Sequence, residues 1–165
     1  MAKSITYTVI YPKPIDQAWA DLCNPAFQEG KLLHAGARDP KVTITPIDKG
    51  GYTMELERQN PVVGVPGAVK KITGEWQHVI ERLKWSPGRA DGTRTADIAV
   101  DFVGIPLAMS GLLTLAPQEA VTTLTLACEF KSSIPLVGGK LESTAAEQTE
   151  MSMNSEAEFM GQFTG

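Results

Sequence analysis

The fold is decided by the stretch IPLVGGKLESTAAEQTEMSMNSEAEFMGQF, residues 134–163. Its first six residues contain one proline and two glycines, which is typical of a strand end and a turn. From Lys140 onward it has no proline, and its only glycine is Gly161. The segment is rich in Ala, Glu, Gln and Met, residues that favour helices. We therefore predict one long helix from Lys140 to about Phe163.

Most residues before this helix are predicted strands, because apolar and polar side chains alternate along them. The clearest case is 93–103, where Val100 and Phe102 share one face and Asp97 and Asp101 fall on the other. The outward position of both aspartates argues against a paired-carboxylate acid/base site there. The predicted strands are residues 4–11, 42–47, 52–58, 75–85, 93–103, 107–115 and 121–132.

Two short helices are predicted between the first and second strands. The first spans residues 15–23 after Pro14, and the second spans residues 25–33 after Asn24, which can cap it. The later strands follow one another through short turns, which indicates an antiparallel meander. A helix of about 23 residues is roughly 35 Å long and can cross a seven-stranded sheet. The predicted class is α+β, with a sheet and a helical layer.

Composition narrows the function classes. The length of 165 residues fits a single domain spanning residues 1–165. A net charge of −4 does not favour nucleic acid binding, which needs clustered Lys and Arg. No apolar run reaches the ~18 residues of a membrane span, so no integral membrane association is expected. Cys23 and Cys128 have no motif spacing, and the N-terminus has no apolar signal core. We expect two reduced thiols in a cytoplasmic protein.

Several segments resemble the START-like superfamily, also called SRPBCC or the polyketide cyclase/dehydrase-like group. The opening PIDQAW at residues 14–19, followed by NPAF at 24–27, looks like the start of that superfamily. The segments at 104–106, 110–115 and 134–142 look like one bacterial branch of it. The resemblance implies a helix-grip fold: a seven-stranded curved antiparallel sheet, two short helices near the N-terminus, and a long C-terminal helix across the concave face. It also implies a hydrophobic ligand held between the sheet and the long helix. Members of the superfamily include carriers, cyclases, dehydratases and regulators of other proteins.

A curved sheet under one helix encloses a concave, mostly apolar space, the usual form of a small-molecule site. The alternation places a set of strand residues toward this space, and each of them could equally be ordinary core. The strand residues predicted to line a ligand site are Tyr52, Met54, Leu56, Ile98, Val100, Phe102, Leu124, Leu126 and Phe130.

The long helix offers two stripes that could face the sheet. The first runs from Leu141 through small or polar residues, which leave volume for a ligand. Its predicted lining residues are Ala145, Thr149, Ser152 and Phe159, with Gln148, Ser155 and Glu156 at neighbouring positions. In the alternative, the buried stripe consists of Ala146, Met153, Ala157 and Met160, and the small residues face solvent.

Two further segments are ambiguous. In strand 75–85 neither face is purely apolar, so His78, Glu81 or Arg82 could anchor a polar group of a ligand. The alternative for this strand, an edge position with solvated charges, is favoured by the mixed pattern. Residues 60–72 combine prolines, glycines and three valines, and they could form an entrance flap or merely a bulky connection.

The sequence contains no recognisable catalytic constellation, metal-ligand spacing or phosphate loop, and no cofactor is expected. The first hypothesis is a carrier or sensor that encloses one hydrophobic or amphipathic molecule of lipid-like or polyketide-like character. The second is an enzyme of the cyclase or dehydratase type that uses His78 or Glu81 as the acid/base. The third is a protein-interaction module whose contact patch is the valine-rich flap or the methionine-rich end of the helix.

Overall fold

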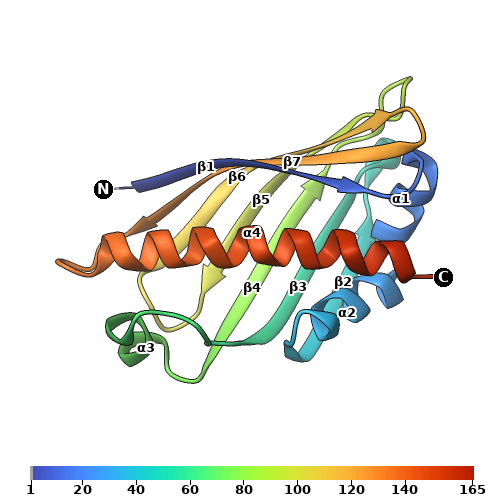
Figure 1. Ribbon diagram of the computed structural model, residues 1–165. Helices are drawn as coiled ribbons and strands as arrows, with labels where there is room; N and C mark the ends of the chain where they lie inside the picture. The colour runs from blue at the N-terminus through green and yellow to red at the C-terminus, as the bar shows by residue number, and fades with distance from the viewer. Residues whose placement is uncertain (1) are drawn as a thin grey trace.

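The computed structural model describes residues 2–165 (Figure 1). Its seven strands form one sheet in the order β1-β7-β6-β5-β4-β3-β2, and every neighbouring pair is antiparallel. The strands are β1 (Ala2–Tyr11), β2 (Arg38–Pro46), β3 (Tyr52–Pro61), β4 (Trp76–Trp85), β5 (Arg94–Phe102), β6 (Leu107–Gln118) and β7 (Val121–Ser132). The helices are α1 (Ile15–Leu22), α2 (Pro25–His34), the 3₁₀ turn η1 (Asp48–Gly50), α3 (Gly67–Thr73) and α4 (Gly138–Gln162). The predicted α+β class and helix-grip architecture are confirmed.

Local signals explain where several elements begin and turn. The Asn24 side chain accepts a hydrogen bond of 3.0 Å from the Ala26 amide, which caps α2. The turn between β2 and β3 contains Lys49 and Gly50 with φ values of 63° and 86°, so the glycine relieves part of the strain of a left-handed turn. At the centre of β6, a Cβ on Gly111 would lie 2.3 Å from the Ala127 carbonyl oxygen of β7. That close approach requires a glycine.

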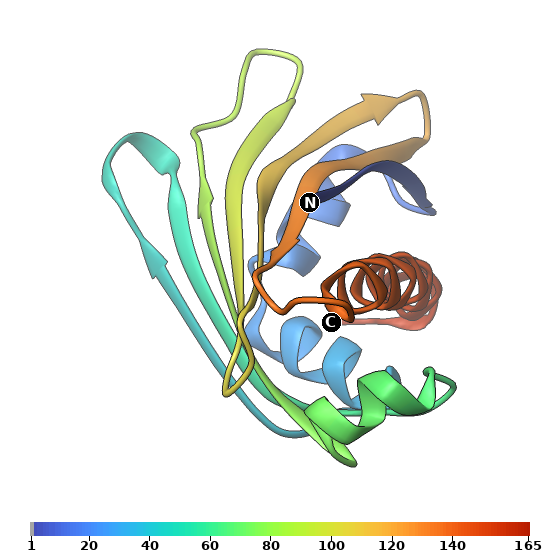
Figure 2. The same cartoon turned by 90° about the vertical axis from the view of Figure 1, so that its left-hand side faces the viewer.

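The sheet curves strongly, and α4 lies on its concave side (Figure 2). This helix packs against β1 and β7 and also meets α2 and α3. It therefore runs along one side of the concave face, close to the strands at the β1 edge. In Figure 2 α2 and α3 lie below α4, on the side where the sheet curls round. All three of these helices therefore lie on the concave side of the sheet.

The order and faces of the strands follow the predicted alternation, but several strands are longer than predicted. β2 begins at Arg38, four residues before the predicted start, and its pairing with β3 shifts register between Arg38 and Lys41. Residues 67–73 form the helix α3, most of which lies within the segment predicted to be a flap or a bulky connection. Within residues 2–165, no helix is both long enough and apolar enough to cross a membrane.

Candidate ligand-binding cavity

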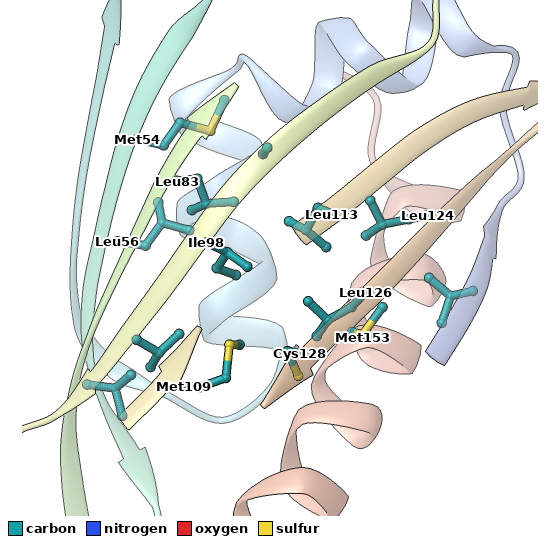
Figure 3. Close-up of a cluster of buried hydrophobic side chains, with 14 of the residues drawn as sticks. Met54, Leu56, Leu83, Ile98, Met109, Leu113, Leu124, Leu126, Cys128 and Met153 are labelled. Carbon is teal, nitrogen blue, oxygen red and sulfur yellow. The ribbon is translucent and has the colours of Figure 1, made fainter. Parts of the chain in front are cut away.

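A cavity of about 680 Å³ lies between the curved sheet and the helices. Its walls are mainly apolar side chains of the middle strands, and Figure 3 shows those of β3, β4 and β5 opposite those of β6 and β7. The volume is within the range of about 300–1,000 Å³ that is usual for small-molecule sites. The predicted residues that the structure places in its wall are Met54, Leu56, Ile98, Val100, Phe102, Leu124, Leu126, Ala145, Thr149 and Ser152.

The structure places His78 on the other face of the sheet. Side chains alternate along a strand, and the inward face of β4 carries Glu81 and its neighbours at odd-numbered positions. His78 Nε2 instead lies 2.5 Å from Glu57 Oε2, and both side chains are partly exposed to solvent. The expected edge position of this strand is also wrong, because β4 pairs with β3 on one side and β5 on the other.

Three predicted aromatic lining residues lie outside the cavity wall. Tyr52 packs edge-on against Trp19 of α1, with ring centroids 5.8 Å apart. Phe130 is completely buried in the core of β7 rather than exposed to the cavity. Phe159 of α4 packs its ring against Gly30 of α2, where an added Cβ would come within 2.5 Å of the ring. Tyr52 therefore packs the sheet against α1, Phe159 packs α4 against α2, and Phe130 fills part of the core.

Residues of both stripes predicted for the long helix are buried. Ala146, Met153 and Met160 are buried in the core, and Met153 points toward the same side-chain cluster as Leu126 (Figure 3). The other stripe borders the cavity, from Leu141 through Ala145, Gln148, Thr149 and Ser152 to Glu156. Thr149 is half-buried, and its hydroxyl donates a 2.8 Å hydrogen bond to the Ala145 carbonyl within the helix. Ser152 is exposed and lies at the rim.

The rim of the cavity lies between α2, α4 and the segment that precedes α3. Val63 is 64% exposed and Met151 is 61% exposed, yet both line the cavity. On α2, His34 contacts Glu158 of α4, with Nε2 and Oε1 3.1 Å apart. The valines of residues 60–72 line the cavity, and Val62 and Val69 among them are buried, which fits both the flap and the packed connection. Whether the segment moves to admit a ligand stays a prediction.

Two ion pairs lie within the cavity wall. Arg58 of β3 donates a hydrogen bond of 2.8 Å from Nη1 to Glu81 Oε1 of β4, and the two side chains are 11% and 14% exposed. Lys31 of α2 pairs with Glu156 of α4, and both are almost as well buried. The Tyr11 hydroxyl of β1 donates a 2.5 Å hydrogen bond to the other oxygen of Glu156. Tyr11, Lys31 and Glu156 thus connect the sheet to two helices, and these three residues together with Arg58 and Glu81 are called the polar network below.

The network shifts the proton affinity of two of its members. Burial favours the neutral form of Glu81, but the charge of Arg58, the charge of Lys31 and the hydrogen bond from Arg58 outweigh it and lower the pKa of this carboxyl. Burial and then the neighbouring Glu156 carboxylate raise the pKa of the Tyr11 phenol well above its ordinary value. Near neutral pH, Glu81 is therefore ionised and Tyr11 is protonated.

Three buried side-chain polar atoms have no hydrogen-bond partner within residues 2–165: Gln28 Oε1, Arg58 Nε and Trp85 Nε1. All three of these residues line the cavity. Buried polar groups in proteins are nearly always satisfied, so an unsatisfied group needs an explanation such as water or a ligand. The buried side-chain atoms that lack a hydrogen-bond partner in the described residues thus all belong to residues of the cavity wall.

The two cysteines carry free thiols. Burial raises the pKa of both to about 11, and for Cys23 the nearby charge of Arg94 only partly opposes this effect. A thiolate is the nucleophilic form of cysteine. Neither residue is therefore suited to nucleophilic catalysis. Within the part of the chain that the structure describes, no group of three or more His, Cys, Asp or Glu side chains could hold a metal ion.

A family model with the description "Protein of unknown function (DUF2505)" matches residues 6–163. The chain belongs to this family. Among curated protein sequences, no match is found.

Solved structures show the same fold as this DUF2505 protein at low sequence identity. A START superfamily protein from Mycobacterium smegmatis is 12% identical, with a TM-score of 0.59 over 98% of this chain and 99% of that one. The Zhui aromatase/cyclase from Streptomyces sp. R1128 is 16% identical, with a TM-score of 0.63 over 98% and 95%. Norcoclaurine synthase from Thalictrum flavum is 8% identical, with a TM-score of 0.56 over 99% and 88%. The START-like fold is therefore established.

Most of the polar network of this DUF2505 protein was not predicted from its sequence. Glu81 was a candidate and Glu156 was named at a neighbouring position, but Tyr11, Lys31 and Arg58 were not. One signal was available in α2, where residues 28, 31, 32 and 35 fall on one helical face and all line the cavity. Gln and Lys at the first two of these positions make that face unusually polar for a buried one.

Proposed function

We propose that this protein binds one hydrophobic or amphipathic small molecule in the cavity between the sheet and α4. The observation that carries the proposal is a space of about 680 Å³ whose walls are largely apolar. An apolar wall of this extent excludes water from a ligand's surface, and the burial of that surface drives binding. A norcoclaurine synthase of this fold has been solved in complex with dopamine and hydroxybenzaldehyde, which supports the fold's capacity for small aromatic molecules.

Ligand binding explains the polar groups of the cavity better than acid/base catalysis of the cyclase or dehydratase type does. A general acid or base works best when its pKa lies near the working pH. The pKa of Glu81 is lowered and that of Tyr11 is raised, so both groups are held away from neutrality in opposite directions. His78, the other acid/base candidate, is paired with Glu57 outside the cavity. The polar network therefore suits recognition of a bound molecule more than proton transfer to it.

A titration with the neutral fluorescent probe N-phenyl-1-naphthylamine tests this proposal. We expect a saturable rise in fluorescence with one probe per chain. The variant Thr149→Trp adds an indole at the cavity wall and should weaken binding by about tenfold or more, because it removes volume that the probe needs. Glu147→Trp places the same side chain at an exposed position of α4 outside the cavity wall and is the matched control.

Circular dichroism would verify that both variants fold before their affinities are compared. Probe binding that Thr149→Trp leaves unchanged would place the site elsewhere and contradict the proposal. Native mass spectrometry of the purified protein provides an independent measurement. A bound molecule of defined mass that Thr149→Trp loses and Glu147→Trp keeps would identify the ligand class directly.

A further inference from the structure

The ligand's chemistry can be narrowed from the unsatisfied atoms in the cavity, an argument that rests on the proposed function. Gln28 is 2% exposed, and its Nε2 donates a 2.7 Å hydrogen bond to the Leu22 carbonyl oxygen. Since a carbonyl oxygen can only accept, this bond fixes which end of the amide is which. The atom left without a partner is therefore Oε1, an acceptor that a donor group of a bound molecule can satisfy.

Trp85 presents the opposite requirement. It is 2% exposed at the end of β4, its ring packs edge-on against Trp19, and its indole N–H has no acceptor. An indole nitrogen can donate but cannot accept. Among uncharged groups, a hydroxyl or carbonyl oxygen of the ligand can satisfy it.

The acceptor and the donor lie at the same end of the cavity. Gln28 Nε2 is 3.9 Å from the sulfur of Met54, and Met54 of β3 is the cross-strand partner of Leu83 in β4. Trp85 is the next inward-facing residue after Leu83, because side chains alternate along the strand. Gln28 contacts Leu22 of α1 and Trp85 contacts Trp19 of α1, so both unsatisfied residues lie at the end of the cavity beside α1, with Met54 and Leu83 between them.

The charges in the wall leave no surplus for an ionised ligand. Lys31 is paired with Glu156, Arg58 is paired with Glu81, and the exposed Glu158 at the rim lies beside His34, so neither the lysine nor the arginine of the wall is without a carboxylate partner. An ionised group that enters an apolar cavity loses its hydration and needs an opposite charge to compensate. A carboxylate would have to compete with Glu81 or Glu156 for its partner. An uncharged polar group requires no such exchange.

We infer that the cavity accepts an uncharged apolar molecule that carries a hydroxyl group, and that the hydroxyl binds at Gln28 Oε1 and Trp85 Nε1. A hydroxyl both donates and accepts, so it is the smallest uncharged group that can serve an amide oxygen and an N–H donor alike. The apolar body of the molecule lies against the aliphatic wall formed by β5, β6 and β7. Arg58 Nε, four residues after Met54 along β3, offers a further donor to a second oxygen.

The test compares pyrene, 1-hydroxypyrene and pyrene-1-carboxylate by fluorescence titration at pH 7. The three probes share one ring system and differ only in the polar substituent. We expect 1-hydroxypyrene to bind at least about tenfold more tightly than pyrene, since the loss of one hydrogen bond to a buried group is worth about that factor. The carboxylate should bind more weakly than 1-hydroxypyrene, because no cation in the wall is free to neutralise it.

Two variants test the position of the hydroxyl. Gln28→Leu and Trp85→Phe each replace a residue that carries an unsatisfied atom with an apolar one. Each variant should show a smaller preference for 1-hydroxypyrene and should keep the affinity for pyrene. Trp85→Phe is needed because Gln28→Leu also loses the bond to Leu22. Gln59→Leu is the matched control, since Gln59 lies in β3 outside the cavity wall.

The outcomes separate the two proposals. If pyrene and 1-hydroxypyrene bind equally, or if the carboxylate binds most tightly, the hydroxyl inference is overturned and the proposed function stands. If the preference for 1-hydroxypyrene survives in both folded variants, its hydroxyl does not bind at Gln28 and Trp85, and the inference is again overturned. If neither the pyrenes nor N-phenyl-1-naphthylamine bind to the wild-type protein, both proposals fail.

Discussion

The hydroxyl of Tyr11 donates a 2.5 Å hydrogen bond to Glu156, a residue 145 positions later in the chain. The second oxygen of the same carboxylate pairs with Lys31 of α2. One side chain of α4 thus binds the first strand and a short helix at once. This arrangement holds α4 along β1 and α2. The cavity in front of β3 to β6 exists because α4 is held to one side of the concave face.

The first prediction concerns this hydrogen bond. Tyr11→Phe keeps the ring, which is fully buried, but leaves a buried carboxylate oxygen without its donor. We expect the free energy of unfolding to fall by about 1.5–3 kcal/mol, the usual range for a buried hydrogen bond to a charged group. Urea denaturation followed by circular dichroism measures the change.

Tyr7→Phe is the matched control for that experiment. Tyr7 also lies in β1 and donates a 2.8 Å hydrogen bond to Asn154 of α4, but the bond is exposed to water. Its removal should cost no more than about 0.5 kcal/mol. Equal losses in the two variants would show that Glu156 does not depend on Tyr11.

The second prediction is a pH dependence of stability that arises from Glu81. The pKa of Glu81 is lower in the folded protein than its ordinary value, so the folded state binds this proton less readily than the unfolded state does. Its stabilising contribution is therefore fully present above the unfolded pKa, about 4.3, and is lost as the pH falls through the lower folded value. Glu81→Gln lacks this contribution at every pH.

We expect the wild-type protein to exceed Glu81→Gln in free energy of unfolding at pH 6, with the gap narrowing below about pH 4. Urea denaturation across this pH range measures the gap. Glu55→Gln provides the comparison, since Glu55 forms an exposed ion pair with Arg82 that should contribute little. A gap for Glu81→Gln that stays constant from pH 6 to pH 3 would be incompatible with a lowered pKa.

The alternation of side chains predicted the sheet well because it depends only on local sequence. In the middle of β5 and β7 one face is apolar, so Ile98, Val100 and Leu124 could be assigned to the interior directly. In β4 both faces carry charges, and local pattern cannot choose between them. Glu81 faces inward because Arg58 compensates its charge, and that partner is set by the register between β3 and β4.

The network between helices was beyond sequence reasoning for a related reason. Lys31 and Glu156 meet only because α2 and α4 pack together, and no periodicity within either helix reports the other's position. The long helix itself was predicted correctly from its composition. Its two candidate stripes were predicted as alternatives. In the structure the helix lies between β1 and the cavity, so one stripe is buried in the core and the other borders the cavity.

The third prediction concerns the close contact between β6 and β7. In Gly111→Ala the new Cβ would lie 2.3 Å from the Ala127 carbonyl oxygen and 2.7 Å from the Cys128 Cα, and both are backbone atoms that cannot rotate away. The strands would have to separate, so we expect a loss of about 1–3 kcal/mol or more in the free energy of unfolding. Thermal and urea denaturation would both reveal it.

Gly139→Ala is the control for this substitution. Gly139 lies in the first turn of α4, and nothing is within 4 Å of the position its Cβ would take. There the change from glycine to alanine should stabilise the protein by about 0.4–1 kcal/mol. Similar destabilisation at both positions would mean that the β6–β7 contact is not the cause.

The fourth prediction separates His78 from the cavity. His78 lies on the outer face of β4 with Glu57, so His78→Ala should leave the affinity for N-phenyl-1-naphthylamine within about twofold of the wild-type value. Val79 is its immediate neighbour and lines the cavity at 2% exposure. Val79→Ala enlarges the cavity and should change the affinity for the probe measurably. It should also lower the free energy of unfolding. Because the two positions are adjacent in sequence, the comparison isolates the face of the strand as the cause. A loss of binding in His78→Ala, with circular dichroism unchanged, would mean that ligands bind to the convex side of the sheet.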